Sequence, residues 1–207
     1  MKLFIAFTMT NVTQALQIAH QIEKVCDGFF LTHPLLLSAG ITALQEFRKA
    51  FPEKHLVCET RLLRHEQEIV PLFAQEGADG LTVLAGSRNS FIHTSASTAH
   101  DKNKKIYLDL SDSGSVSQAA LEAQSLGVDF LIFSDPYNEE DKHVFVDRWE
   151  MVHGNTRLPI FIATQVTIDN IHDISKLRPA GLIIECTATS DEDFINQVTS
   201  FYAITKD

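Results

Sequence analysis

The residues best equipped for chemistry follow a short apolar run near position 57. A carboxylate, two guanidinium groups and an imidazole occur within one short stretch, as Glu59, Arg61, Arg64 and His65. Because side chains alternate along a strand, Glu59 and Arg61 should point to the same side of a strand end. A guanidinium fork matches a phosphate or carboxylate in a bidentate way. In a chain with a formal net charge of −10, this cluster predicts the floor of an anion-binding site.

The same residues also allow an interpretation without a site. Arg61 and Arg64 would then be exposed residues at the start of the following helix, paired with Glu66 or Glu68. Surface pairs of this kind contribute little to stability and do not indicate function.

The elements that must position these residues alternate between two patterns. Buried apolar runs predict strands at 2–8, 28–32, 55–59, 80–84, 105–110, 129–133, 159–163 and 180–185. Helical spacing predicts helices at about 12–25, 41–51, 69–73, 88–100, 116–126, 139–152, 168–177 and 191–203. Asn11, Ser115 and Thr167 are the expected N-caps, and His33-Pro34 is expected to end the second strand.

This alternation predicts an α/β fold with a parallel sheet covered on both faces. Eight strand–helix units, spaced by about 25 residues, favour closure into a (β/α)8 TIM barrel over an open sheet. A motif that ends a helix and begins a strand recurs around 25–29, 76–81, 126–130 and 178–182. In two copies a glycine, Gly77 or Gly127, takes the position after the helix where a positive φ is needed. We expect one domain spanning residues 1–207.

Active sites of such barrels lie at the C-terminal ends of the strands. The polar residues expected there form a ring around the two guanidinium groups. The strand ends that form the ring are Thr8, Thr32, His33, Glu59, Arg61, Arg64, His65, Ala85, Gly86, Ser87, Asp109, Ser111, Ser134, Asp135, Thr164, Gln165, Glu185 and Thr187.

Composition narrows the classes of partner and compartment. The acidic balance argues against nucleic acid or an anionic membrane as the main partner. Cys26, Cys58 and Cys186 form no Cys-x-x-Cys pair, and their odd number suits reduced, buried thiols. No apolar run approaches the ~20 residues that span a bilayer, so we expect a cytoplasmic protein. Trp149 lies among apolar residues of its helix and is expected in core or dimer packing.

With the strands placed, the chain resembles the orotidine-monophosphate decarboxylase superfamily along its whole length. The likeness is greatest to the 3-hexulose-6-phosphate synthase and 3-keto-L-gulonate-6-phosphate decarboxylase branch. It is carried by Met1-Lys2-Leu3, Pro34-Leu35, Phe51-Pro52-Glu53-Lys54, Gly77-Ala78-Asp79, Val83-Leu84, Lys104-Lys105, Asp109-Leu110, Leu126-Gly127-Val128-Asp129 and Pro159-Ile160. Most of these are scaffold positions, which speak for the fold more than for activity.

The resemblance implies roles for individual residues. The family's Asp-x-Lys-x-x-Asp signature falls on Glu59, Arg61 and Arg64, so the last carboxylate is replaced by a positive charge. In the family the first Asp helps to hold Mg2+ and the Lys stabilises an enediolate. Glu59, Arg61 and the retained Asp109 are therefore the catalytic candidates. The substrate-binding candidates are Thr8, His33, Arg64, His65, Ser134, Thr164, Gln165 and Thr187.

Several positions depart from the family pattern. Thr8 stands where an Asp is expected, Phe30 where a metal-binding Glu is expected, and Ser134 where some members carry a catalytic His. The two Gly-Gly phosphate loops correspond to Thr164-Gln165 and Glu185-Cys186. Without glycine, a phosphate approaches backbone amides less closely. No metal is expected, unless the family's Mg2+ chemistry survives.

Three functional hypotheses follow. The chain is an active carbon–carbon lyase on a sugar phosphate with a variant site, or a sugar-phosphate or keto-acid binder whose activity is altered or lost. A weaker hypothesis uses His33, His65 and Glu59 as a metal set for another barrel reaction. By resemblance only, we expect a homodimer.

Overall fold

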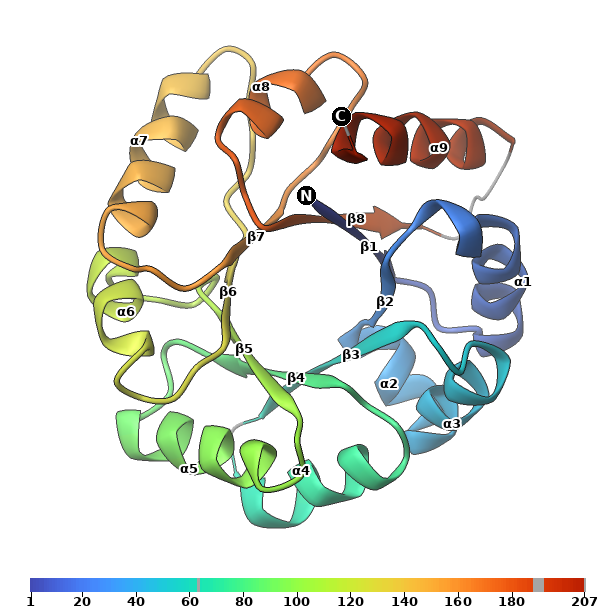
Figure 1. Cartoon of the computed structure of the whole chain (residues 1–207), viewed down its shortest axis with the longest axis vertical. Coiled ribbons are helices and arrows are strands. Elements are labelled where there is room, and N and C mark those ends of the chain that lie inside the picture. The colour runs from blue at the N-terminus through green and yellow to red at the C-terminus, as the bar shows by residue number, and fades with distance from the viewer. Residues whose placement is uncertain (63, 188–191, 207) are drawn as a thin grey trace.

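Eight parallel strands close into one barrel in the computed structural model, which describes residues 1–62, 64–187 and 192–206 (Figure 1). Each strand pairs with its neighbour in the sequence, and β1 also pairs with β8, so no sheet edge is left open. The strands are β1 (Lys2–Phe7), β2 (Gly28–Leu31), β3 (His55–Leu62), β4 (Gly80–Leu84), β5 (Lys105–Asp109), β6 (Phe130–Phe133), β7 (Ile160–Ala163) and β8 (Gly181–Cys186).

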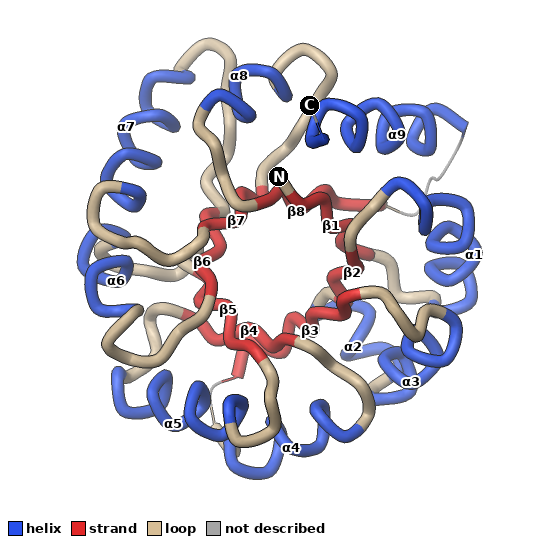
Figure 2. The backbone as a smooth tube through the Cα atoms, in the orientation of Figure 1, coloured by secondary structure: helices blue, strands red, loops and turns tan. Residues whose placement is uncertain are grey.

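Helices form the outer ring around these strands (Figure 2). They are α1 (Val12–Ile22) with the short 3-10 helix η1 (Glu23–Val25), α2 (His33–Ala39), α3 (Ile41–Ala50), α4 (Glu66–Gln75), α5 (Asn89–His100), α6 (Val116–Ala123), α7 (Lys142–His153), α8 (Ile171–Lys176) and α9 (Glu192–Lys206). The predicted (β/α)8 barrel is therefore confirmed. None of the described helices is long and apolar enough to cross a membrane.

Most predicted boundaries lie close to those of the structure. Seven of the eight strands begin and end within one residue of the predicted ranges, and β3 runs three residues further. The side chain of Asn11 accepts the Gln14 amide at 3.0 Å, and that of Ser115 accepts the Gln118 amide, so both N-caps are confirmed.

Two helix predictions were wrong. His33-Pro34 does not merely end β2 but begins α2, since proline is well tolerated in a first helical turn. Gly40, with φ +59°, then separates α2 from α3. Thr167 does not cap α8 directly, because that helix begins at Ile171. The hydroxyl of Thr167 instead accepts the Asn170 amide in a preceding turn. Asp191, predicted to open the last helix, lies outside the described residues.

Apolar side chains fill the barrel interior and the layer between strands and helices. The interior cluster contains Phe4, Phe30, Tyr107 and Phe161, with ring centroids of Tyr107 and Phe161 5.8 Å apart. Trp149 is 1% exposed and lies edge-on to Phe133, so its predicted core packing is confirmed. All three cysteines are buried free thiols.

The recurrent motif at helix-to-strand junctions has a structural reason. Asp27, Asp79 and Asp129 each precede an even-numbered strand, and each carboxylate accepts a backbone amide from the preceding odd-numbered strand. The acceptor distances are 2.8 Å from Leu3 N, 2.9 Å from Leu56 N and 2.9 Å from Ile106 N. The fourth copy of the motif has Ala180 in this place, so β7 and β8 lack the equivalent carboxylate.

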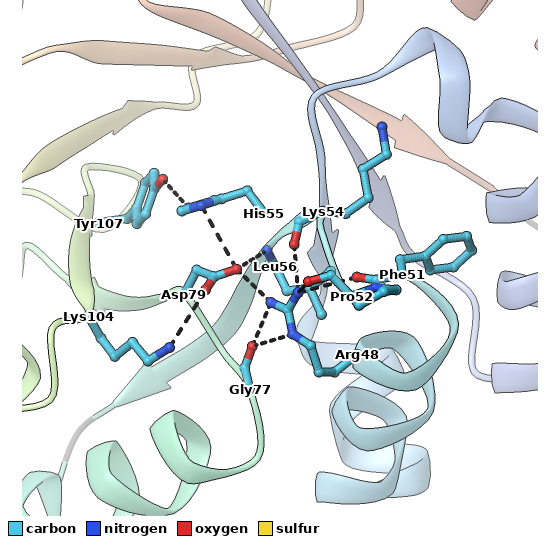
Figure 3. A network of polar contacts seen from close by, with 10 residues as sticks. All are labelled: Arg48, Phe51, Pro52, Lys54, His55, Leu56, Gly77, Asp79, Lys104 and Tyr107. Carbon is cyan, nitrogen blue, oxygen red and sulfur yellow. Dashed lines mark hydrogen bonds and ion pairs between the residues drawn. The ribbon is translucent and has the colours of Figure 1, made fainter.

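Asp79 is the centre of the largest of these polar networks (Figure 3). Arg48 from α3 donates to Asp79 at 2.6 Å and also to the carbonyl oxygen of Gly77. The same guanidinium donates to the carbonyl oxygens of Phe51, Pro52 and Lys54. One side chain thus joins the end of α3, the start of β3 and the start of β4.

The network also determines which groups carry charge. Burial alone would raise the pKa of Asp79, but the Leu56 amide and the Arg48 guanidinium outweigh it and hold that pKa below its usual value. Burial lowers the pKa of His55, whose ring nitrogen lies 3.1 Å from the Tyr107 hydroxyl. Since the folded pKa of Asp79 is depressed, its contribution to stability is present above the unfolded pKa and is lost as pH falls through the folded value.

Arg48→Met should therefore destabilise the barrel. It removes the hydrogen-bond donor of the Asp79 carboxylate and of four carbonyl groups, while a side chain of similar length and apolar character remains. We expect a loss of about 2–3 kcal/mol in the free energy of unfolding at neutral pH, measured by urea denaturation. The loss should shrink as pH falls and Asp79 becomes protonated.

The matched control is Lys176→Ala, which removes an exposed ion pair with Asp173 on α8. We expect it to leave the unfolding midpoint unchanged. Equal effects of the two substitutions would contradict the structural role given to Arg48.

Candidate functional site

A cavity of about 330 Å³ opens at the C-terminal ends of the strands, and we call it the central pocket. Its apolar lining comes from the barrel interior and includes Phe30 and Ile132. Its charged lining consists of three carboxylates and one guanidinium among the described residues. The polar lining residues are Thr8, Thr32, Glu59, Arg61, Thr82, Asp109, Ser111, Ser134 and Glu185.

Glu59 and Arg61 form an ion pair at this pocket, as the alternation of β3 predicted. Two guanidinium nitrogens of Arg61 donate to the same oxygen of Glu59, at 2.8 and 3.1 Å. The other Glu59 oxygen accepts the His33 amide at 2.7 Å, at the start of α2. The carboxylate is therefore held by a side chain on one side and a helix N-terminus on the other.

A local irregularity of β3 places Arg61 in this position. The register between β3 and β4 shifts between Cys58 and Leu62, and Arg61 has a positive φ of 43°. Thr82 of β4 stabilises the irregularity, because its hydroxyl accepts the Arg61 amide at 3.2 Å and its carbonyl accepts the Thr60 hydroxyl at 2.9 Å. Such bulges commonly redirect a side chain toward a site.

Asp109 supplies a carboxyl group with altered acidity at the end of β5. It is 4% exposed, and one oxygen accepts the Ser111 amide at 2.9 Å, with the Ser134 hydroxyl at 3.5 Å. Burial raises the pKa of Asp109, although the Ser111 amide and the nearby Arg61 act in the opposite direction. A buried carboxyl group of this kind keeps its proton to a higher pH than an exposed aspartate does.

One polar lining residue of the central pocket was missed at the sequence level, and three were seen only as part of the ring. Thr82 was missed because it lies inside β4 and not at its end. The signal for it is a single hydroxyl within the apolar run Gly80–Leu84. Thr32, Ser111 and Glu185 belong to the predicted ring but were not chosen as site residues.

Three predicted substrate-binding residues lie in a neighbouring cavity of about 530 Å³, which we call the side hollow. Thr164, Gln165 and Thr187 line it, and Ser134 and Glu185 line both the side hollow and the central pocket. No lysine or arginine lines the side hollow within the described part of the chain. The Asp135 carboxylate at its edge is paired with Arg148.

Arg64 and His65 do not line the central pocket, so the prediction that both guanidinium groups converge there is wrong. Arg64 lines a separate cavity of about 540 Å³, the rim hollow, together with Ser87, Arg88, Ser90 and others. His65 has a positive φ of 61° and is the residue from which α4 starts. This turn carries the chain away from the pocket directly after β3.

The alternative pairing with the helix is also wrong. Both arginines are exposed, as that interpretation expected, but within the described residues Arg61 pairs with Glu59 and neither arginine forms an ion pair with Glu66 or Glu68.

The metal hypotheses do not fit the side chains that are present. Within the described residues, no three His, Cys, Asp or Glu side chains are grouped to hold a metal ion, which excludes the set of His33, His65 and Glu59. For Mg2+, both Glu59 oxygens are already engaged by donors. Phe30 presents a ring where the resemblance placed a carboxylate. An octahedral oxygen shell would therefore lack protein ligands.

Comparisons with known proteins agree with this architecture. No family model matches the chain. A 3-hexulose-6-phosphate synthase of Bacillus subtilis is 23% identical over 195 residues, covering 93% of each chain. A protein of the same name from Mycobacterium gastri is 25% identical over 177 residues, covering 85% of this chain and 86% of its own.

Solved structures show the same fold. A 3-hexulose-6-phosphate synthase of Salmonella typhimurium superposes with a TM-score of 0.88 at 17% identity, covering 99% of this chain and 98% of its own. KGPDC from Streptococcus mutans, solved as a ligand complex, gives a TM-score of 0.86 at 17% identity, covering 99% and 97%. The chain thus belongs to the class of (β/α)8 barrels, and its central pocket lies at the C-terminal ends of the strands. Over most of its length the chain is similar to proteins named 3-hexulose-6-phosphate synthase, and it shares the fold of the solved synthase and KGPDC structures.

Asp109→Asn should stabilise the folded protein at neutral pH, because it removes a buried charge and keeps an oxygen for the Ser111 amide. The raised pKa means that the folded state binds this proton more tightly than the unfolded state. The cost of ionising Asp109 is therefore absent below its unfolded pKa and is complete above its folded pKa.

We expect the melting temperature of Asp109→Asn to exceed that of the unaltered protein by about 2–4 °C at pH 8, which is about 1 kcal/mol for a chain of this size. The difference should disappear toward pH ~4, near the ordinary pKa of aspartate. A variant that melts lower at every pH would contradict the buried, costly carboxylate.

Proposed function

We propose that this barrel binds a small phosphorylated sugar or keto-acid at the central pocket, with altered or lost aldolase or decarboxylase activity. The observation that supports it best is the grouping of Glu59, Arg61 and Asp109 around one open pocket at the strand ends. The names of the curated relatives support the substrate class. Such a protein would act in the cytoplasm, in carbohydrate metabolism.

The argument for altered activity comes from the side chains that replace the family's catalytic groups. Thr8, Phe30 and Ser134 all line the central pocket, so these replacements lie where chemistry would occur. The Thr8 hydroxyl is already committed to the Cys186 carbonyl at 3.0 Å. Arg61 differs from a lysine because it stays protonated and cannot cycle as a proton carrier.

An active lyase is the second candidate, and Asp109 is the observation that favours it. Cleavage of a hexulose 6-phosphate would break one carbon–carbon bond as Asp109 takes the hydroxyl proton of the departing carbon, which leaves as formaldehyde. The bonding electrons would form the enediolate of a pentulose 5-phosphate, whose charge Arg61 would balance. Return of the proton from Asp109 to carbon would complete the reaction. None of these steps passes through a metal ion.

A binding protein without turnover is the third candidate. In that case Glu59 and Arg61 would hold the hydroxyl groups of a sugar in place, since both already point at the pocket. By resemblance alone, we also propose that the chain forms a homodimer whose interface lies at the mouth of the barrel.

The central test combines two measurements on the full chain. Formaldehyde release from hexulose 6-phosphate is assayed with and without Mg2+, beside a thermal-shift screen of phosphorylated sugars. We expect a saturable thermal shift with little or no formaldehyde release. Turnover that requires Mg2+ would overturn our argument from the lost ligands, and no response to any phosphorylated compound would overturn the proposed substrate class.

Arg61→Gln provides the residue-level test. Because Arg61 is the only guanidinium among the described residues of the central pocket, its loss should weaken binding of the sugar phosphate by about 10-fold or more. Arg157→Gln is the matched control, since Arg157 is exposed in the loop before β7, at the opposite end of the barrel. Equal affinity of both variants would remove Arg61 from the site.

A further inference from the structure

The rim hollow lies outside the central pocket and shares no lining residue with it. It is formed by the chain between β3 and α4, and by the chain between β4 and the first turns of α5. Arg64 comes from the first segment and Arg88 from the second, so two loops each contribute one guanidinium to the same cavity.

Both guanidinium groups are free to take a ligand. Neither Arg64 nor Arg88 has a side-chain hydrogen bond or an ion pair within residues 1–62, 64–187 and 192–206. Arg61, only three positions before Arg64, is by contrast paired with Glu59 through two of its nitrogens. The two arginines are exposed, so they support no core packing that would explain their positions.

Neutral donors complete the cavity. The Ser87 hydroxyl oxygen is buried and has no hydrogen-bond partner in the described part of the chain. Ser90 lies in the first turn of α5, a helix of 12 residues whose N-cap, Arg88, provides no side-chain cap. The Phe91 amide donates to the Arg88 carbonyl oxygen at 2.9 Å, so only the amides before it lack an intrahelical partner at the positive end of the helix dipole.

The balance of charge distinguishes the rim hollow from the other two cavities. Two arginines and one carboxylate, Glu66, line it. The central pocket has three carboxylates and a single arginine, and the side hollow has no lysine or arginine among its described lining residues. The Asp112 carboxylate accepts the amide of Gly86, another lining residue, at 2.9 Å. A dianion is thus better stabilised at the rim than anywhere else in the mouth.

We infer that Arg64 and Arg88 form a second binding site, which takes a phosphate group. A guanidinium fork from each of two loops, with hydroxyl and amide donors between them, matches the tetrahedral set of phosphate oxygens. The inference does not rest on the proposed function, because inorganic phosphate alone tests it. The phosphate belongs either to a separate phosphomonoester or to the ligand whose other end enters the central pocket.

A single ligand that reaches both the central pocket and the rim hollow is compatible with the spacing of Arg61 and Arg64 in the chain. Arg64 follows Arg61 by three positions, so their Cα atoms lie at most about 11 Å apart. One elongated sugar phosphate would then place its carbon chain at Arg61 and its phosphate at Arg64.

The test is calorimetric titration of the full chain with inorganic phosphate at constant ionic strength. We expect saturable binding by the unaltered protein and by the control Arg157→Gln. Arg64→Gln and Arg88→Gln should each weaken the affinity by about 10-fold, and the double variant should abolish binding. Because both residues are exposed, melting temperatures without phosphate should stay unchanged, which shows that the variants fold.

A second titration, with hexulose 6-phosphate, distinguishes the two sources. If one ligand spans both cavities, Arg61→Gln and the Arg64→Gln/Arg88→Gln double variant will both weaken it, while Arg61→Gln leaves inorganic phosphate binding intact. If the sites are separate, the double variant will lose inorganic phosphate and keep the sugar phosphate. Either pattern supports the second site.

Three results would overturn it. They are no saturable binding of phosphate by the unaltered protein, unchanged binding by the double variant, or a change of molecular mass in the double variant without a change in phosphate affinity. The last result would mean that Arg64 and Arg88 hold carboxylates of a second copy of the chain.

Discussion

Half-buried aspartates that bond the backbone of a neighbouring strand set the base of this barrel. Asp27, Asp79 and Asp129 each accept an amide of the strand before them, while cations lie on their outer side: Lys206 at Asp27, Arg48 and Lys104 at Asp79, and Lys105 at Asp129. Fixing the N-terminal ends sets the register of these strand pairs, which β3 and β4 keep as far as Cys58. The carboxyl groups of Glu59 and Asp109 line one pocket at the far ends of the strands.

The mouth of the barrel is electrostatically divided. The central pocket holds carboxylates and one guanidinium, Arg61, which is already paired with Glu59. The unpaired guanidinium groups of Arg64 and Arg88 lie at the rim hollow. A ligand with a neutral, hydroxyl-rich end and a strongly negative end fits that division better than a uniformly charged one. The buried Asp109 is the costly element of the central pocket, because burial disfavours its charged form.

Much of the fold could be predicted because periodicity and glycine placement report local structure directly. The strand ranges, the caps at Asn11 and Ser115, and Gly77 and Gly127, with φ of +103° and +82°, all follow from neighbouring residues. The failures arose where distant residues decide the conformation. The path of the chain after β3 depends on the bond from Arg61 to Thr82, which lies 21 positions away in the sequence.

That single irregularity explains why the site was only partly predicted. Simple alternation predicted that Glu59 and Arg61 lie together, which is correct, although an irregular β3 and not regular alternation brings Arg61 to the pocket. It could not foresee that a positive φ at Arg61 and again at His65 would send Arg64 to a different cavity. Thr82 was overlooked for the related reason that its hydroxyl faces inward from the middle of a strand.

The absence of a fourth aspartate has a dynamic consequence. At the junctions that lead into β2, β4 and β6 a carboxylate bonds the preceding strand, whereas the junction into β8 has Ala180, whose backbone alone bonds to Ile160 at 2.8 Å. Cooperative opening events begin where the fewest interactions must be broken. Among these four strand pairs, β7 and β8, which also border the side hollow, should therefore separate most readily and expose their amides to hydrogen exchange first.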